Sequence, residues 1–532
     1  MTIAALLCVP VLWVAVFRPI WDVDIFWHIV AGRWIWEHAA LPTTDVFSAA
    51  DPTRPWYTFQ WLYEVVVYFL DDLGGLLLIR LVSSLLVISA FVVFFRRLRT
   101  YIGPTELVLF LMSLLVVLYS DRIRVRPHIV NFLFMAIFLP LFLQPRRHNQ
   151  PIRTLITRVA ILVGLWANLH AGGALMFLVT LLAVPIGEIG SYMVRNKPGA
   201  NREAPRIKET CLLWFVVAAV AAIMPHFVTG NVQAITMLEA SRPLIDEWMS
   251  PWGYIDRFLE LSDRGKTVYS LLLTGIAPYC AFLSVTVTAL VLLVRRGVAG
   301  VVSLAHPTEW LFALGTSLIA MSSARFAWWS ILSFAVVVRV ITHPPLSRSV
   351  RIAALVGTLV LSGVAWQRYF TSMAGSFAST LDTMHHDIDE PRFPTTAADF
   401  LETAAFSGDI WCLPNWGGYL LWRLHPQVRV LSDGRGNFDQ TVGEELLLVY
   451  EQRFRSDAYD AVSSAYARFT NIDAIVIQPP GFGNISPPSL WKTVLKTRRE
   501  EIYYRIRPEN QANIDRAEKL LEEIGRRHSG RQ

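Results

Sequence analysis

The sequence predicts a polytopic α-helical membrane protein with a C-terminal extracytoplasmic α/β domain. Of its 532 residues, 54% are hydrophobic and only 17% are charged, and the mean hydropathy is +0.41. Several apolar runs reach the roughly 20 residues that a helix needs to cross a bilayer core of about 30 Å. After about residue 385 the charges become more frequent and the apolar runs shorten. A soluble protein of this length would carry more charge throughout.

About eleven apolar segments fit the hydropathy of membrane-spanning helices. The first of them lacks the basic start and the small-residue cleavage site of a signal peptide, so we expect it to be retained. The predicted spans are 3–19, 76–95, 105–119, 129–144, 155–169, 171–193, 209–225, 268–294, 308–322, 325–341 and 351–367.

Basic residues in the loops between these segments predict the orientation. Loops rich in arginine and lysine alternate with loops that are not, and the positive-inside rule places the basic set in the cytoplasm. The outer set comprises about 20–75, 120–128, 226–267 and everything after about 368. We therefore expect an integral protein of a bacterial inner or plasma membrane, with the N-terminus cytoplasmic and the C-terminal domain extracytoplasmic.

The chain divides into two predicted domains. Residues 1–370 form a transmembrane domain that carries the outer loops, and residues 385–532 form a soluble α/β domain. Strand-like stretches in the second domain, GDIWCLP, VRVLSD and IDAIVIQ, alternate with helical ones. Its last part, 511–527, predicts an amphipathic charged helix.

Charge and cysteine usage exclude two classes of function. The net charge of +6 and the pI near 9.1 arise mostly from loop residues that orient the protein, so no nucleic acid partner is predicted. The four cysteines are scattered and three lie in apolar runs, which predicts neither a disulfide framework nor a zinc site.

Ionisable side chains directly follow the first apolar segment, in WDVDIFWHIVAGRWIWEH. Asp22, Asp24 and His28 lie where the chain leaves the membrane, and ionisable groups at that depth are functional candidates because their burial is costly. Asp24 and His28 share one face of a helix, and the surrounding aromatic residues fit a helix that lies in the interface. Alternatively, Asp22 caps this helix and His28 packs beneath it. The aromatic residues that follow, between 56 and 63, either pack or stack on a sugar.

Three arginines and a histidine lie in the second outer loop, SDRIRVRPH. Arg122, Arg124, Arg126 and His128 break the positive-inside rule, and arginine near hydrocarbon is costly. A lipid phosphate or diphosphate would compensate for this charge, because guanidinium binds phosphate in bidentate geometry. Asp121 is the competing explanation, as a salt-bridge partner for one of the three arginines.

Two further candidates lie in later outer loops. Glu247 stands beside Asp246 and Trp248 in IDEWMSP, where it would bind a metal, a sugar hydroxyl or an acceptor, or remain a solvated charge. Arg325 opens a late apolar segment on the outer side, and it either joins the phosphate site or snorkels to the membrane surface.

The order of these pieces resembles the GT-C glycosyltransferase superfamily, and within it the catalytic subunit of oligosaccharyltransferase. An aspartate follows the first span in that superfamily, as Asp24 does here. The approach to the second span, Gly74–Arg80, is similar to that of protein mannosyltransferases. The oligosaccharyltransferase subunit also has a glutamate before an aromatic residue and a proline, which Glu247 matches, and an arginine that opens a late span, which Arg325 matches.

The outer domain of the family carries a tryptophan-aspartate-tyrosine-glycine signature, followed by an arginine and a motif of a small residue and aspartate. Asn415–Tyr419 (NWGGY), Arg429 and Ser432–Arg435 (SDGR) resemble this order. The signature aspartate is absent, and RVRPH stands where the family has an acidic pair that binds a divalent metal. These departures argue against asparagine-linked glycosylation. The resemblance implies an acceptor side formed by Glu247, Trp416, Tyr419, Asp433 and Arg435.

The resemblance implies an inverting glycosyltransferase that moves a sugar from a polyprenyl-phosphate-linked donor to a glycan, lipid or protein acceptor. Asp24 would act as general base or position the acceptor, with Asp22 and His28 beside it, and the arginines would hold the phosphate. A divalent metal, Mg²⁺ or Mn²⁺, bound by Asp24 and Glu247 is one expectation, and metal-independent transfer is the other. The alternative function is a non-catalytic glycolipid-binding or transport protein of the cell envelope, against which the absence of a paired repeat argues.

Overall fold

The computed structural model of the chain contains two compact units, which we call the helical unit and the sheet unit. The helical unit comprises Met1–Ile20, Leu76–Asn231 and Ile245–Asp387, and the sheet unit comprises Trp21–Gly75, Val232–Leu244 and Ile388–Gln532. The structure describes residues 19–119, 122–143, 151–195, 206–241, 248–253, 255, 268–342, 347–373, 386–437, 471–479 and 490–529.

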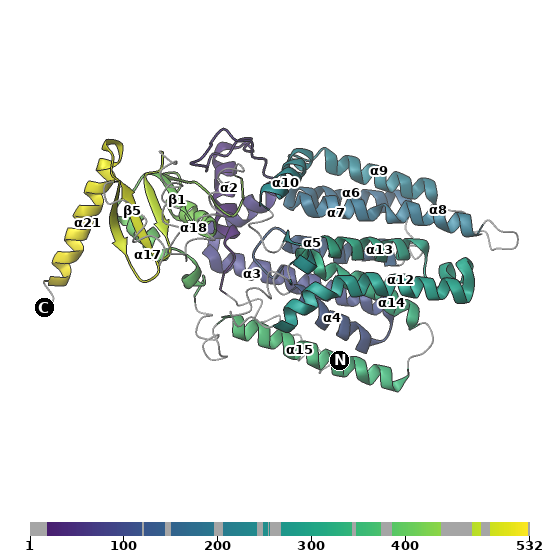
Figure 1. Cartoon of the computed structure of the whole chain (residues 1–532). Helices are drawn as coiled ribbons and strands as arrows, with labels where there is room; N and C mark the ends of the chain where they lie inside the picture. Colours follow the sequence, from purple (N-terminus) through teal and green to yellow (C-terminus); the bar gives the residue numbers. More distant parts are fainter. Residues whose placement is uncertain are drawn as a thin grey trace. The chain divides into compact units, whose positions relative to one another are not determined.

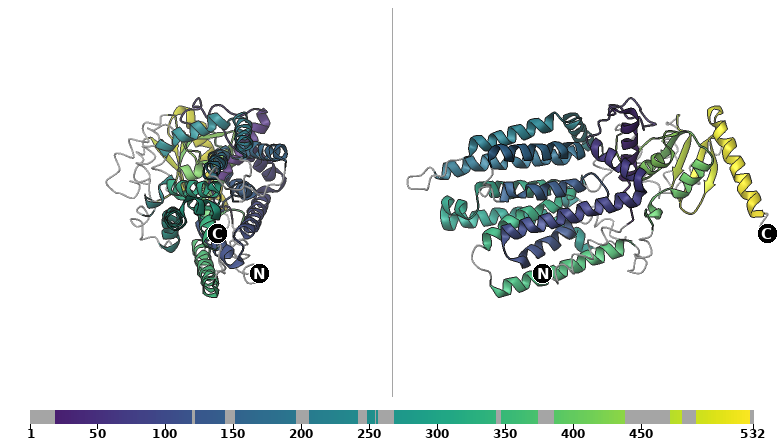
Figure 2. Two further views of the ribbon diagram at one scale, coloured as in Figure 1. Left: turned by 90° about the vertical axis from the view of Figure 1, so that its right-hand side faces the viewer. Right: turned by 180° about the vertical axis from the view of Figure 1, so that it is seen from behind.

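Long apolar helices build the helical unit, and they run side by side in the views of Figure 1 and Figure 2. They are α3 (Trp61–Ile102, which enters this unit at Leu76), α4 (Thr105–Tyr119), α5 (Ile129–Leu143), α6 (Ile152–Leu169), α7 (Ala171–Leu181), α8 (Ala183–Arg195), α9 (Ile207–Ala222), the start of α10 (Phe227–Ser241, which belongs to the sheet unit from Val232), α12 (Val268–Leu304), α13 (Pro307–Ser322), η5 (Ala324–Trp329), α14 (Ser330–Ile341) and α15 (Arg348–Met373).

Each predicted span from 76–95 onward coincides with one or two of these helices. In the described part of the chain, six helices are long and apolar enough to cross a membrane, or seven if the bent pair α9 and α10 counts as one span. The protein is therefore an integral membrane protein. The first predicted span, 3–19, falls almost wholly outside the described residues, and the total of eleven stays a prediction.

Helix α3 consists of two helices that meet at Gly74 and Gly75. Gly75 has φ +63°, a conformation that residues with a side chain rarely adopt. The stretch Gly74–Arg80, singled out in the sequence, thus contains the break. Arg80 lies just after it, where Nη1 donates to Asp387 Oδ1 and to the His386 carbonyl oxygen, each at 3.1 Å.

A five-stranded sheet forms the centre of the sheet unit. Its strand order is β2-β1-β3-β5-β4; β1 pairs with β2 and β3 in parallel, whereas β5 pairs with β3 and β4 antiparallel. The three predicted strands and the predicted C-terminal helix are confirmed. The elements are β1 (Gly408–Cys412), β2 (Val428–Val430), β3 (Ala474–Ile477), β4 (Trp491–Lys496), β5 (Glu501–Arg505), α2 (Asp24–His38), α17 (Thr395–Thr403), α18 (Pro414–Leu424) and α21 (Gln511–Ser529).

Strands β4 and β5 were not among the predicted strands. Lysine, arginine and glutamate in WKTVLKTRREEIYYR hide the alternation of apolar side chains that marks a strand. In the structure β5 lies inside the sheet between β3 and β4, and its isoleucine and tyrosines are buried.

The loop after the first predicted span belongs to the sheet unit, although the sequence analysis grouped it with the transmembrane domain. Val430 N donates to Phe47 O at 3.1 Å, and Ala49 N donates to Val430 O at 2.9 Å. Residues 47–49 therefore extend the sheet beyond its edge strand β2, which satisfies backbone groups that an edge leaves unpaired. At the start of α10, Gln233 Oε1 accepts from Tyr57 N at 2.9 Å, so this helix end holds the same loop.

Candidate active site

Helix α2 presents the acidic residues that follow the first predicted span. The helix begins at Asp24, and Asp22 Oδ1 accepts a hydrogen bond from Asp24 N at 3.0 Å. Both carboxylates are buried. Asp22 therefore fixes the backbone at the start of α2, where Val23 is the N-cap residue.

The Asp24 carboxylate lies against Gly434, in the turn that carries the SDGR motif. A Cβ atom on Gly434 would lie only 2.1 Å from Asp24 Oδ1. A side chain at this position would displace the carboxylate, so glycine lets the turn approach it closely. Two segments that the sequence marked separately, Asp24 and the motif around Asp433, are thus in contact within one unit.

Two glycines of NWGGY explain how α18 reaches α2. A Cβ on Gly418 would lie 3.1 Å from Val23 O and 3.3 Å from Trp27 N. A Cβ on Gly417 would lie 2.2 Å from Ser432 O, so this glycine lets the SDGR turn pack on the other side of α18. The motif therefore joins α2 to the turn that contacts Asp24.

The aromatic residues of NWGGY are buried in the same packing. Trp416 Nε1 donates to Arg392 O at 3.1 Å. The ring of Tyr419 meets Phe26 edge-on at a centroid distance of 5.0 Å, and its hydroxyl oxygen accepts from Arg423 Nη1 at 3.2 Å. These contacts give Trp416 and Tyr419 a positioning role beneath α2.

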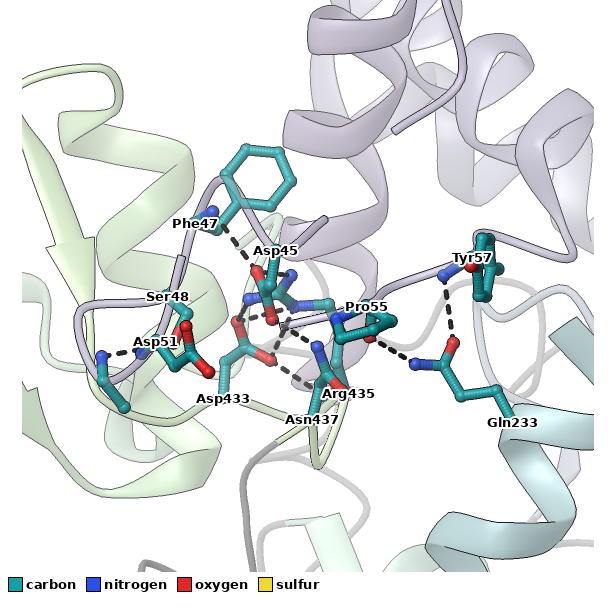
Figure 3. A network of polar contacts seen from close by, with 11 residues as sticks. Asp45, Phe47, Ser48, Asp51, Pro55, Tyr57, Gln233, Asp433, Arg435 and Asn437 are labelled. Carbon is teal, nitrogen blue, oxygen red and sulfur yellow. Dashed lines mark hydrogen bonds and ion pairs between the residues drawn. The ribbon is translucent and has the colours of Figure 1, made fainter. Parts of the chain in front are cut away.

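Arg435 connects the SDGR turn to the loop that follows α2 (Figure 3). Its guanidinium contacts Asp45 Oδ1 and Asp433 Oδ2, each at 2.6 Å, and Asn437 Nδ2 donates to Asp45 Oδ2 at 2.8 Å. The guanidinium carbon also lies 4.8 Å from the ring centroid of Trp56. The Arg435 side chain is only 4% exposed. Arg435 and Asp433 therefore fix the turn, and Trp56 packs against them.

His28 forms a buried pair with a carboxylate that the sequence analysis did not select. His28 Nδ1 lies 3.3 Å from Glu64 Oε1, and Glu64 Oε2 accepts from Thr58 Oγ1 at 2.5 Å. The ring of His28 lies against that of Trp27, with centroids 3.6 Å apart. The sequence around Glu64 does not indicate that it pairs with His28, because His28 lies 36 residues earlier in the chain.

The arginine-rich loop lies in the helical unit, before α5. His128 Nε2 donates to Arg122 O at 2.7 Å, and Arg126 N donates to Arg124 O at 2.9 Å. Burial lowers the pKa of His128 well below its ordinary value, and the charges of Arg122 and Arg126 lower it further. His128 is therefore neutral at pH 7 and braces the loop, which leaves the positive charge with the arginines. Asp121, the competing salt-bridge partner, is outside the described residues.

Arg325 also belongs to the helical unit, at the start of η5. Its guanidinium carbon lies 5.5 Å from the ring centroids of Trp248 and Phe326. Burial lowers the pKa of His170 to about 4, and the charge of Arg325 contributes to that shift. Arg325 is thus close enough to the loop between α6 and α7 to act electrostatically on it.

Of the two predicted metal ligands, Asp24 and Glu247, the structure describes only Asp24. Glu247 lies outside the described residues, as does its neighbour Asp246. Across the described ranges, no group of three or more His, Cys, Asp or Glu side chains could hold a metal ion. Near Asp24, the carboxylate of Asp433 is already bound by Arg435. The described residues do not fit a divalent ion, and a metal site that includes Glu247 stays a prediction.

Two of the solved structures that match this chain cover most of its length. The crystal structure of ArnT from Cupriavidus metallidurans bound to undecaprenyl phosphate matches with a TM-score of 0.49 and 10% identity, over 95% of this chain and 98% of that one. The apo oligosaccharyltransferase of Archaeoglobus fulgidus matches with a TM-score of 0.47 and 13% identity, over 90% of this chain and 69% of that one.

No protein-family model matches the sequence, and no curated protein matches it.

Proposed function

We propose that this protein is an inverting membrane glycosyltransferase of the GT-C type, which transfers a sugar from a polyprenyl-phosphate-linked donor at the extracytoplasmic face. The observation that carries the proposal is the buried Asp24 carboxylate set against Gly434 of the SDGR turn. A carboxylate that the fold keeps within reach of a glycine-lined turn is suited to general base catalysis.

Asp24 acts on the acceptor in this mechanism. A hydroxyl oxygen of the acceptor forms a bond to the anomeric carbon of the donor sugar while its proton passes to the Asp24 carboxylate. The bond between that carbon and the phosphate oxygen breaks, and the phosphate leaves with the electron pair. Attack from the face opposite the phosphate inverts the anomeric configuration. Asp22 supports this step by fixing the backbone at Asp24 N.

The arginine-rich loop serves the donor in this mechanism. Negative charge grows on the phosphate as it leaves, and guanidinium groups stabilise it. Neutral His128 braces the loop through the Arg122 carbonyl, so Arg122, Arg124 and Arg126 supply positive charge to a phosphate at the membrane surface. Arg325 supplies a further guanidinium from η5.

The acceptor side and the metal belong to the same proposal. The acceptor side, which supports Asp24 through the packing described above, is formed by Trp416, Tyr419, Asp433 and Arg435. Glu247 binds the acceptor or, together with Asp24, a divalent metal. The acceptor is a glycan, a lipid or a protein. The membrane is a bacterial inner or plasma membrane, and the C-terminal domain lies outside, as the alternation of basic loops supports.

Replacing Asp24 by asparagine tests the proposal, because the substitution removes the base and keeps the shape. The chain is expressed in cells that lack it, and envelope glycans are compared by mass spectrometry. We expect Asp24→Asn to remove the glycan that the native protein restores. Asp51→Asn is the matched control, since Asp51 lies in the following loop and is exposed.

Full restoration of the glycan by Asp24→Asn would exclude Asp24 as the base. If neither the native chain nor the variant changes any glycan, but purified protein still binds a polyprenyl phosphate, the protein is the non-catalytic glycolipid-binding or transport protein that the sequence left as the alternative.

A further inference from the structure

A hydrogen-bond donor stands next to the Asp24 carboxylate and is not used by the mechanism above. A Cβ atom on Gly434 would lie 2.1 Å from Asp24 Oδ1 and 3.4 Å from Trp27 Nε1, so both atoms are close to this one position. The Trp27 side chain is deeply buried, with 6% of the residue exposed. Among the residues that the structure describes, Nε1 has no hydrogen-bond partner. A buried indole N–H is normally paired, so this one indicates a ligand.

The surroundings of Trp27 hold its ring in this direction. One side lies against His28, with ring centroids 3.6 Å apart, and Trp56 meets the ring edge-on at 6.5 Å. His28 is itself held by Glu64, which accepts from Thr58. Buried neighbours therefore hold the ring, and Nε1 and the Asp24 carboxylate both lie beside Gly434.

We infer that Trp27 and Asp24 together bind one hydroxyl group of the acceptor, and that they select an alcohol as the acceptor. This inference rests on the proposed function and deepens it. A hydroxyl donates one hydrogen bond and accepts another on a single oxygen atom, so it satisfies the carboxylate and the indole N–H at once. Its second lone pair then attacks the anomeric carbon while the proton moves to Asp24.

Other chemical groups fit this pair less well. An ammonium group has donors only and leaves the indole N–H unpaired, whereas a phosphate has acceptors only and is repelled by the carboxylate. A carboxamide has its donor and acceptor on different atoms. A sugar or polyol hydroxyl is the acceptor class that the pair favours.

The test measures binding to the full-length protein in lipid nanodiscs. The probes are methyl α-D-mannopyranoside, methyl α-D-glucopyranoside and methyl α-D-galactopyranoside, with acetamide as the carboxamide probe, each titrated by saturation-transfer difference NMR. We expect at least one glycoside to bind and Trp27→Phe to weaken it about tenfold, the upper end of the range for one hydrogen bond. Trp36→Phe, an exposed indole on the same helix, should have no effect.

Further variants separate binding from folding. Trp27→His returns a ring N–H and should recover part of the affinity, whereas Gly434→Ala fills the space beside the pair and should abolish binding. Equal affinity of Trp27→Phe and the native protein for every glycoside overturns the inference. The absence of glycoside binding, or an equal loss of acetamide binding in Trp27→Phe, overturns it as well.

The two proposals fail in different ways. If Asp24→Asn removes the envelope glycan but glycoside affinity is unchanged in Trp27→Phe, the transferase stands and the alcohol site is wrong. If glycoside binding depends on Trp27 but Asp24→Asn still restores the full glycan, the site binds sugars and the transferase is wrong.

Discussion

Arg435 Nη1 donates to Asp45 Oδ1 at 2.6 Å, although 390 residues separate the two in the chain. The same guanidinium binds Asp433, so one cation holds two carboxylates from distant segments. The loop after the first predicted span and the C-terminal domain therefore fold as one body. The contact between Asp24 and the turn around Gly434 therefore depends on this shared tertiary structure, because the two segments are far apart in the sequence.

Loss of the Arg435 guanidinium should strongly destabilise the sheet unit. Arg435→Met leaves two buried carboxylates, Asp45 and Asp433, without their cation, which typically costs about 3–5 kcal/mol. Thermal unfolding of purified protein, followed by fluorescence-detected size exclusion, measures the effect. Arg526→Met serves as control because its salt-bridge side chain is 77% exposed, and such pairs contribute about 0–1 kcal/mol. A triple variant that also carries Asp45→Asn and Asp433→Asn should regain part of the stability. Equal melting temperatures of Arg435→Met and Arg526→Met would contradict this prediction.

A methyl group at Gly434 should impair transfer more than stability. Gly434→Ala places a Cβ 2.1 Å from Asp24 Oδ1, so the carboxylate must move. A displacement of about 1 Å in a catalytic group lowers a rate by as much as about 100-fold. The envelope glycan assay measures this loss, with Gly315→Ala as control because nothing lies within 4 Å of a Cβ there. Normal glycan output from Gly434→Ala would show that the contact with Asp24 is not needed.

The packing of α2 on the start of α3 should also be sensitive to one methyl group. A Cβ on Gly32 would lie 2.0 Å from the backbone oxygen of Glu64, which has no freedom to rotate away. Gly32→Ala should therefore destabilise the protein by about 1–3 kcal/mol, the usual range for overpacking. Its melting temperature is compared with that of Gly525→Ala, which meets nothing within 4 Å. Equal melting temperatures would mean that the two helices are not in close contact.

The protein should lose stability in mild acid through His128. Burial, then the charges of Arg122 and Arg126, hold its pKa well below the ordinary value of 6.5. The unfolded chain takes up a proton there as the pH falls below about 6.5, and the folded chain does not. The stability contributed by neutral His128 is thus complete above that pH and is lost as the pH falls toward the folded pKa, by up to about 1.4 kcal/mol per pH unit.

Melting temperatures of the native protein and of His128→Gln between about pH 5 and pH 8 check this prediction. The variant should show a shallower decline below about pH 6.5, and His38→Gln, an exposed histidine of α2, should follow the native curve. Identical curves for the native protein and His128→Gln would exclude a neutral His128 as the cause.

The sequence allowed much of the fold to be predicted, because apolar periodicity is a local property. The spans from 76–95 onward, strands β1 to β3 and helix α21 all carry their own signal. Strands β4 and β5 do not, since charged side chains interrupt their apolar pattern and their burial depends on β3. The position of α2 within the sheet unit likewise depends on tertiary contacts.

The candidate site residues also differ in whether their role is visible in the local sequence or depends on tertiary contacts. Asp24 and Asp433 could be selected because a costly charge and a short motif are visible in the sequence. Glu64, Trp27 and Asp45 could not, because each acquires its role from a partner elsewhere in space. The need for Gly434 appears only when the neighbouring carboxylate is known.

The proposed transfer requires a donor phosphate bound at the arginine-rich loop. The most direct measurement is a cryo-EM structure of the native chain in nanodiscs with a polyprenyl phosphate. We predict density for the phosphate at Arg122, Arg124 and Arg126. Phosphate bound elsewhere in the protein would contradict the proposed role of these arginines.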